Sequence, residues 1–338
     1  MRNKNHFVSR GYLRNWCGSE DQLWVYRTLV SSHNVKLWQK FYPKSVAYHL
    51  HLYSQLKDQK LDDEIEEWFD KEFESPAESS INRALKDARL SSDDWNNLIK
   101  FIALHDARSP VRLKEHIEAA PKLFSEIFAN LGEKISKKNL EEITEKSYPI
   151  KNKATIPLKI KPIFNVNEKE LFLKIESYVG RSTWLFSLKH TLINTSKILH
   201  SHKWTIVRPY KGMNWFTSDN PVIRLNFISQ NQYDLKGGWG VKRGNILFPI
   251  DPEHLLLTQI GCRPPLKGTR LGKEQTVFIR KITAENSYRM IFSREPDQDI
   301  EEYAPRLVDQ KLFRNEQEMW KKWHEENTLL EATFAKTT

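Results

Sequence analysis

The sequence has few of the features on which disulfide-bonded, membrane-spanning or disordered proteins depend. Its two cysteines, Cys17 and Cys262, cannot build a disulfide framework, so we expect a reducing, cytoplasmic location. No run of 18 apolar residues is available to span a membrane, and the first ten residues lack the apolar core of a signal peptide. Only 12 glycines occur, whereas aromatic residues make up 12%, which argues against a disordered or fibrous chain. The 338 residues therefore predict one large or two closely packed domains.

Several enzyme motifs are also missing. The chain contains no GxxxxGK[ST] phosphate-binding loop, no GxGxxG after a strand, and neither HExxH nor GxSxG. The Gly237–Gly238–Trp239–Gly240 segment has the wrong glycine pattern for a dinucleotide site. The P-loop, Rossmann, zincin and α/β-hydrolase families are therefore poor candidates.

Charged residues make up 28% of the chain, but they are unevenly distributed along it. The net charge is +10, yet residues 60–78 contain nine acids and two lysines, so this segment is −7 and the remainder is +17. The cations concentrate at 146–161, 197–211, 236–243 and 263–281, and aromatic residues lie among them. This pattern is typical of nucleic-acid binding, but it also fits a solvated basic surface over core aromatics. The acidic segment could instead dock on that basic surface.

Hydrophobic periodicity predicts an α+β fold. We expect a β-rich N-terminal segment (1–60), a helical region (61–147), an extended linker (148–165) and an α/β C-terminal half (166–338), which together form one compact unit. The two β-rich parts are expected to join one sheet flanked by helices. The predicted helices are 6–16, 62–74, 75–89, 92–109, 111–131, 137–147, one or two within 167–200, 273–290 and 308–325. Predicted strands include 22–28, 34–41, 45–53 and several segments within 204–260.

Five segments carry a family likeness. They are His6–Trp16, Leu23–Tyr26, Ala103–Pro110, Trp215–Val222 (with Thr217-Ser218-Asp219-Asn220-Pro221 at its centre) and Phe248–Pro252. In the order and residue types of these five segments, the chain resembles the bacterial domain-of-unknown-function family 4238. Ser9 and Ser109 depart mildly from the Pro and Thr of the family pattern. The resemblance implies a fold but no activity, so function must be argued from the residues.

The first candidate site contains His6, Arg10 and Arg14. If residues 6–16 form one helix, these three side chains share a face, because they are four residues apart. Two arginines one turn apart can clamp a phosphate, and His6 can act as the catalytic acid or base. The alternative is structural: His6 supports the fold and the arginines pair with the acidic segment.

The second candidate site is the turn Ser218–Asp219–Asn220. At the end of a strand, Asp219 could be catalytic and hold Mg²⁺ or orient a water, with Ser218 and Asn220 binding the ligand. One carboxylate is too few for a metal site, so a partner such as Asp106, Glu72 or Asp251 would be needed. The alternative is a turn stabilised by its own Asx side chains.

The third candidate site lies at the end of a predicted helix, where Asp106 is a catalytic and Arg108 a binding candidate. An inward-pointing Arg108 needs a carboxylate, which Asp219 or the acidic segment could supply. His105 falls on the apolar face and is expected to be a core residue. The pairs His49/His51 and His200/His202 have a spacing that suits metal ligands, but chance explains it as well, so we assign no metal ligands.

These residues favour an enzyme that acts on nucleic acid or nucleotide phosphodiesters through a His/Arg/Asp site, with Mg²⁺ as the candidate cofactor and a phosphate-bearing ligand as the partner. The alternative is a non-catalytic module that binds nucleic acid or protein, in which Arg108 and Asp219 are structural. A third hypothesis is a purely structural or regulatory protein. The enzyme hypothesis expects His6, Arg10, Arg108 and Asp219 to surround one pocket, and scattered positions would contradict this site.

Overall fold

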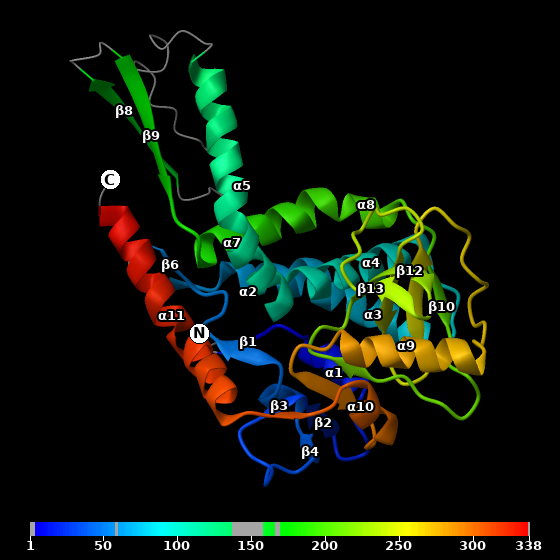
Figure 1. Cartoon of the computed structure of the whole chain (residues 1–338). Helices are drawn as coiled ribbons and strands as arrows, with labels where there is room; N and C mark the ends of the chain where they lie inside the picture. The colour runs from blue at the N-terminus through cyan, green and yellow to red at the C-terminus, as the bar shows by residue number, and fades with distance from the viewer. Residues whose placement is uncertain (1–3, 58–59, 137–157, 166–169, 337–338) are drawn as a thin grey trace.

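The computed structural model describes residues 4–57, 60–136, 158–165 and 170–336, and it confirms the α+β fold. Helices occupy the middle of the chain, and strands occur on both sides of them in the sequence (Figure 1). The strands divide between two larger sheets and several two-stranded ribbons, rather than forming the single sheet that we expected. Within the described residues, no helix combines the length and apolar composition that crossing a bilayer requires.

A four-stranded antiparallel sheet joins the two β-rich parts of the chain. Its order is β11 (Thr217–Ser218), β16 (Met290–Ser293), β2 (Leu23–Arg27) and β4 (Trp38–Phe41). Strand β2 lies between β16 and β4, so the N-terminal hairpin is completed by a strand more than 260 residues further along the chain. The expected association of the two β regions therefore occurs in this sheet.

A five-stranded antiparallel sheet is built from the C-terminal half alone. Its order is β10 (Thr205–Val207), β15 (Leu255–Gln259), β14 (Asn245–Pro249), β12 (Ile223–Ser229) and β13 (Gln232–Asp234). The central strand β14 is buried from Ile246 to Pro249, so both of its faces contact protein.

The helices of the middle region pack around one long buried helix. They are α2 (Glu64–Phe69), the π-helical turn η2 (Asp70–Glu74), α3 (Ser75–Leu85), α4 (Ser92–Ala107), α5 (Pro110–Ser136), α7 (Arg181–His190), the π-helical turn η3 (Thr191–Thr195) and α8 (Lys197–His200). Helix α4 starts at a capping box in which Ser91 and Asp94 bond each other's backbone N–H groups. Residues 101–110 are all buried, which makes the end of α4 the centre of the molecule.

The N-terminal segment forms short elements instead of the helix predicted over 6–16. Strand β1 (Lys4–His6) pairs with β5 (Tyr48–Leu50), and α1 (Arg10–Arg14) begins only after Ser9, whose side chain accepts from the backbone N–H of Tyr12. The turn η1 (Pro43–Ser45) precedes β5. Other ribbons pair β6 (Gln55–Lys57) with β7 (Lys60–Asp62), and β3 (Leu29–Val30) with β17 (Leu307–Val308).

A second difference from the prediction lies in the expected linker and the segment after it. Strands β8 (Leu158–Asn165) and β9 (Glu170–Ser177) form an antiparallel hairpin that projects beside α5 (Figure 1). The helices predicted within 167–200 are present as α7 and α8, but they begin only at Arg181, after β9. The predicted helix at 137–147 lies outside the described residues.

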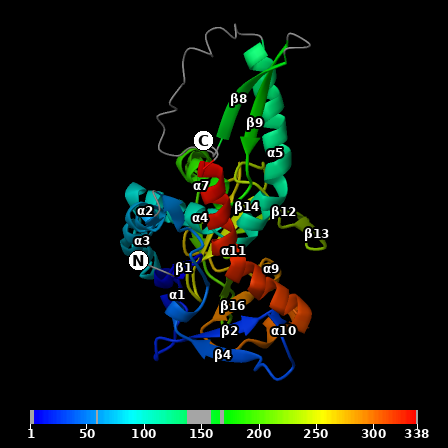
Figure 2. The same cartoon turned by 90° about the vertical axis from the view of Figure 1, so that its left-hand side faces the viewer.

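Three further helices complete the fold. Helix α9 (Lys273–Glu285) connects the two larger sheets, and α10 (Gln298–Tyr303) follows β16. Helix α11 (Gln310–Lys336) runs along one side of the molecule, past the β1–β5 ribbon (Figure 2). Trp320 and Trp323 of α11 are buried, and the Trp323 Nε1–H donates to the carbonyl of Leu52 at 3.3 Å, so α11 is firmly attached to the N-terminal segment.

Candidate functional site

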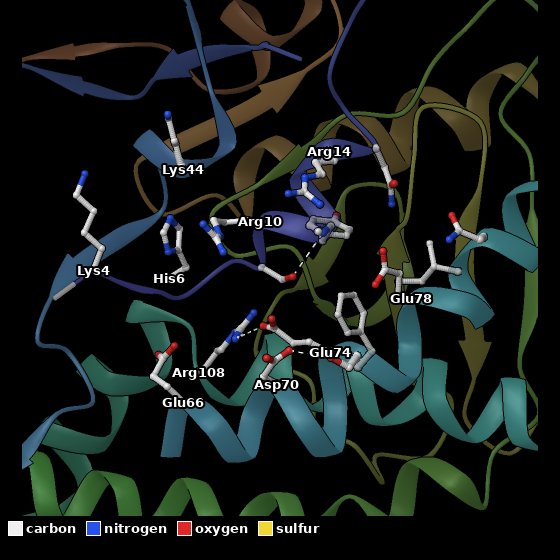
Figure 3. A pocket seen from close by; sticks show the side chains of 18 of the residues that line it. Lys4, His6, Arg10, Arg14, Lys44, Glu66, Asp70, Glu74, Glu78 and Arg108 are labelled. Atoms are coloured by element: carbon white, nitrogen blue, oxygen red, sulfur yellow. Dashed lines mark hydrogen bonds and ion pairs between the residues drawn. The ribbon is translucent and has the colours of Figure 1, made fainter. Parts of the chain in front are cut away.

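A cavity of about 790 Å³ lies between the N-terminal segment and the α2–η2–α3 helices. One side, the basic wall, consists of side chains from β1, α1 and η1: Lys4, His6, Arg10, Arg14 and Lys44. The opposite side, the acidic wall, consists of side chains from α2, η2 and α3: Glu66, Asp70, Glu74 and Glu78. Figure 3 shows the two walls facing each other. We call this cavity the cleft; its size is typical of small-molecule sites.

Helix α1 holds the two arginines of the basic wall in place. Arg10 and Arg14 are four residues apart and exposed, so they present neighbouring guanidiniums to the cleft. The helix is fixed from below by Tyr12, whose hydroxyl donates to the carbonyl of Pro249 at 2.6 Å and lies 2.6 Å from the Thr217 hydroxyl. Asn15 adds a bond from its amide to the carbonyl of Ile250 at 3.0 Å. The Thr217 and Phe248–Pro252 segments of the family likeness therefore support α1.

His6 lines the cleft from strand β1 rather than from a helix, yet it still lies with Arg10 and Arg14. Burial and the positive charges of Arg10, Arg108 and Lys4 lower the pKa of His6 to about 4, against a backbone hydrogen bond to Lys44 that raises it. The imidazole is therefore neutral at pH 7. Its Nε2 atom has no hydrogen-bond partner among the described residues. The neutral ring therefore has a buried nitrogen at the cleft with no described partner.

The acidic wall follows from one regular spacing. Glu66, Asp70, Glu74 and Glu78 are four residues apart, and all four line the cleft. The π-helical turn η2 carries Asp70 and Glu74. Such turns occur often at functional sites because they shift side chains out of the regular helical register.

Arg108 connects the acidic wall to the base of the cleft. Its side chain is only 2% exposed, and its Nη1 lies 2.6 Å from a carboxylate oxygen of Glu74. The Nε donates to the carbonyl of Phe7 at 3.1 Å, and Nη2 lies 3.3 Å from His105 Nε2. The expected ion pair between Arg108 and the acidic segment is thus present, with Glu74 as the partner and not Asp219. Arg108 is a positioning residue that joins the strand before α1 to the acidic wall.

Asp219 lies outside the cleft. It is fully buried and accepts backbone N–H bonds from Tyr288, Arg289 and Met290 at 2.7, 2.7 and 2.9 Å. Asn220 is buried beside it, and its amide donates to the carbonyl of Asn286 at 2.9 Å. Ser218 accepts from the backbone N–H of Asn220 at 3.2 Å. The turn lies away from the cleft: Asp219 joins β11 to β16, and the amide of Asn220 bonds the end of α9.

Asp106 is also separate from the cleft. Its Oδ1 accepts from Arg112 at 2.8 Å, and its Oδ2 accepts from the indole N–H of Trp239 at 2.7 Å and lies 3.7 Å from Arg224. Burial alone would raise the pKa of Asp106, but the guanidiniums of Arg112 and Arg224 hold it below its ordinary value. Asp106 thus anchors the five-stranded sheet to the helices. Of the three predicted catalytic residues, His6 is the one that lines the cleft.

The histidine pairs take part in packing. His49 stacks on Trp320 with ring centroids 3.9 Å apart, and His51 stacks on His324 at 4.4 Å. His202 Nε2 lies 2.6 Å from the carbonyl of Trp239. Among the described residues, no three His, Cys, Asp or Glu side chains are grouped as metal ligands.

The sequence analysis missed the acidic wall as part of the site, together with Lys4 and Lys44. The acidic residues were seen as a charged helix, but their four-residue spacing was not used. That spacing places carboxylates on one helical face, so it was the signal that could have identified them. Lys4 and Lys44 reach the cleft through the β1–β5 pairing, which sequence spacing does not reveal.

The comparisons with known proteins agree with the likeness seen in the sequence. A family model described as "Protein of unknown function (DUF4238)" matches residues 4–297. No curated protein and no solved structure matches the chain. The matched region includes both walls of the cleft and ends before α10. The chain therefore belongs to the DUF4238 family.

Proposed function

We propose that this DUF4238 family member binds a phosphate-bearing ligand of nucleotide size in the cleft and hydrolyses its phosphate ester. The observation that supports this most directly is that His6, Arg10 and Arg14 line one cavity although they come from two different elements. Guanidiniums one turn apart suit a phosphate, and the adjacent neutral imidazole suits proton transfer.

The cations of the basic wall are not paired with carboxylates among the described residues, so their charge can attract a ligand. No ion pair joins Arg10 or Arg14 to a carboxylate in the part of the chain that the structure describes. Lys4 and Lys44 have contacts with the rings of Tyr48 and Tyr42, which leave their charge uncompensated. Four cations beside one histidine give a positive potential that attracts a phosphate mono- or diester.

The proposed chemistry needs only water as a second reactant. In it, His6 Nε2 removes a proton from a water whose oxygen attacks phosphorus. The P–O bond to the leaving group breaks, and the leaving oxygen takes a proton from solvent. Arg10 and Arg14 stabilise the charge on the non-bridging oxygens during this transfer. The bound phosphate also raises the low pKa of His6, because it offsets the neighbouring cations, and this improves the base.

The test combines binding and turnover. Calorimetric titration with AMP and CMP at 50 mM salt measures binding, and release of nitrophenol from bis(4-nitrophenyl) phosphate, with EDTA or with Mg²⁺, measures hydrolysis. We expect His6→Gln to lower kcat by about 10²–10⁴-fold with binding retained, whereas Arg10→Gln with Arg14→Gln weakens binding. Arg263→Gln is the control, since Arg263 is exposed and distant in sequence from the cleft elements. Absence of nucleotide binding by the unmodified chain would overturn the proposal.

The alternative function is binding without turnover. It is favoured by the burial of Arg108 and Asp219, which both have structural partners, and by the position of Asp106 outside the cleft. The same two assays distinguish the functions. A nucleotide that binds tightly and is recovered unchanged, with and without Mg²⁺, would identify a non-catalytic module.

A further inference from the structure

We propose that the ligand of the cleft is zwitterionic: a phosphate ester that also carries a cationic amine, with the phosphate at the basic wall and the amine at the acidic wall. This inference rests on the proposed function, because it takes the phosphate position as given. It adds the class of ligand and assigns a role to the carboxylates, which the hydrolytic step does not use.

Two carboxylates of the acidic wall, Asp70 and Glu78, carry the argument for a cationic group. Glu74 is paired with Arg108 at 2.6 Å. Asp70 accepts from the neutral hydroxyl of Ser75 at 2.9 Å, and Glu78 is exposed on the next turn. No ion pair of Asp70 or Glu78 occurs within the described residues. Like charges four residues apart on a helix repel each other, so this arrangement costs stability unless a cation is bound.

The two walls do not neutralise each other. Arg108–Glu74 is the ion pair found at the base of the cleft, and it leaves Arg10 and Arg14 facing Asp70 and Glu78 across the open volume (Figure 3). The cleft therefore contains two opposed fields within one cavity of about 790 Å³. A ligand with charges of both signs gains from each wall, whereas a simple phosphate meets repulsion from the acidic wall.

An ammonium group fits the acidic wall better than a neutral polar group does. Hydroxyls of a sugar could donate hydrogen bonds to Asp70 or Glu78 but would leave the negative charge in place. An ammonium donates up to three hydrogen bonds and removes the charge, and charge-assisted bonds are about twice as strong as neutral ones. A divalent cation between the phosphate and the carboxylates would be the competing explanation, and the test below separates the two.

The experiment compares two ligands that differ only in the amine: 4-aminobutyl phosphate and butyl phosphate, titrated calorimetrically into the full chain in EDTA. We expect the amine to bind at least about tenfold more tightly, which corresponds to one charge-assisted bond. In the double variant Asp70→Asn/Glu78→Gln this preference should disappear, because the amides keep the shape but not the charge. Glu72→Gln is the matched control, since Glu72 lies on the same helical segment but does not line the cleft.

Each outcome is informative. Equal affinities for the two phosphates, with no effect of the double variant, would overturn the zwitterionic ligand and leave the proposed function intact. Equal affinities in EDTA together with a Mg²⁺-dependent gain for butyl phosphate that the double variant abolishes would assign the acidic wall to a metal instead. If neither phosphate binds while the chain is folded by circular dichroism, the proposed function itself fails.

Discussion

Asp219 supports the fold through the bonds that its carboxylate accepts, since three backbone N–H groups of β16 and the preceding turn converge on it. We predict that Asp219→Ala lowers the free energy of unfolding by about 3 kcal/mol or more, because three buried N–H donors lose their acceptor. Urea unfolding measures the change, and Asp93→Ala on the exposed first turn of α4 is the control. A variant that folds normally but is inactive would instead indicate a catalytic role.

We predict that the affinity of the cleft for an anion depends on pH through His6. Its pKa of about 4 in the free chain is raised when an anion binds beside it. The bound state therefore takes up a proton, and affinity should increase as pH falls from 7 towards the pKa of the free state, where the gain levels off. Sulfate is a suitable probe because it does not titrate in this range.

Calorimetry between pH 7 and pH 4.5 would show this increase for the unmodified chain. The His6→Gln variant should bind sulfate with an affinity that is nearly independent of pH, since glutamine carries no titrating group. A pH dependence that is unchanged in this variant would mean that another residue takes up the proton.

At this scale the sequence predicted the basic wall better than it predicted the carboxylates. Arg10 and Arg14 could be placed on one face because that placement depends on local helical spacing. The surroundings of Asp219 and Asp106 could not be foreseen, since the backbone N–H of Arg289 and the indole of Trp239 lie 70 and 133 residues away from them, respectively. A carboxylate at a strand end has the same sequence pattern whether its side chain contacts a substrate or accepts backbone N–H bonds.

Among the elements, α11 depends on one buried ion pair. Arg181 at the start of α7 is fully buried and contacts Glu331 at 2.6 Å, and it also lies 2.9 Å from Nδ1 of His324. We predict that Arg181→Met destabilises the chain by about 3–5 kcal/mol, because the buried carboxylate loses its guanidinium.

The double variant Arg181→Met/Glu331→Leu should recover most of this loss, since no buried charge then remains unmatched. Thermal unfolding of the single and double variants measures the difference. If the double variant is as unstable as the single one, the guanidinium contributes through its other contacts, such as the one to His324, and not mainly through the ion pair.

The elements also show where hydrophobic periodicity predicts secondary structure correctly and where it does not. A helix from Ser92 to about Ser109 was predicted from its apolar face, and α4 (Ser92–Ala107) confirms it. The ribbon β8–β9 was missed because its strands pair with each other rather than with a larger sheet. The break of the predicted helix 6–16 at Ser9 arises from the long-range pairing of β1 with β5, which local propensity does not report.

The whole molecule should lose stability in acid because histidines are buried in their neutral form. Burial lowers the pKa of His49 to about 3, and burial together with Arg108 lowers that of His105 well below 6.5. The unfolded chain takes up protons below about pH 6.5 while the folded chain does not. Stability is therefore complete above pH 6.5 and is lost progressively as pH falls towards 3.

The variant His49→Phe tests this prediction, because phenylalanine keeps the stacking on Trp320 but has no titrating group. We expect its Tm to fall less steeply between pH 6.5 and pH 4 than that of the unmodified chain. A parallel decrease in the two proteins would show that His49 does not contribute to the acid sensitivity.

The net charge of +10 is organised more locally than the sequence indicated. The acidic segment carries Glu66, Asp70 and Glu74 into a cavity opposite cations from the first 44 residues. From the sequence, the acidic segment was a possible partner of Arg10 and Arg14 or of the cations beyond residue 145. The opposition of the two walls arises from the folding of the N-terminal ribbon against α2 and α3, and composition alone does not contain that information.

The position of β2 in the middle of its sheet has a consequence for biosynthesis. Strand β2 emerges from the ribosome early, but its partner β16 follows about 260 residues later. At about 5–20 residues per second, this interval lasts roughly 13–50 s, during which one edge of β2 has no partner. The nascent chain therefore presents an unpaired strand edge for most of its synthesis. A chaperone that shields residues 23–27 would act before the sheet can close, and a slower translation rate would lengthen the period of exposure to aggregation.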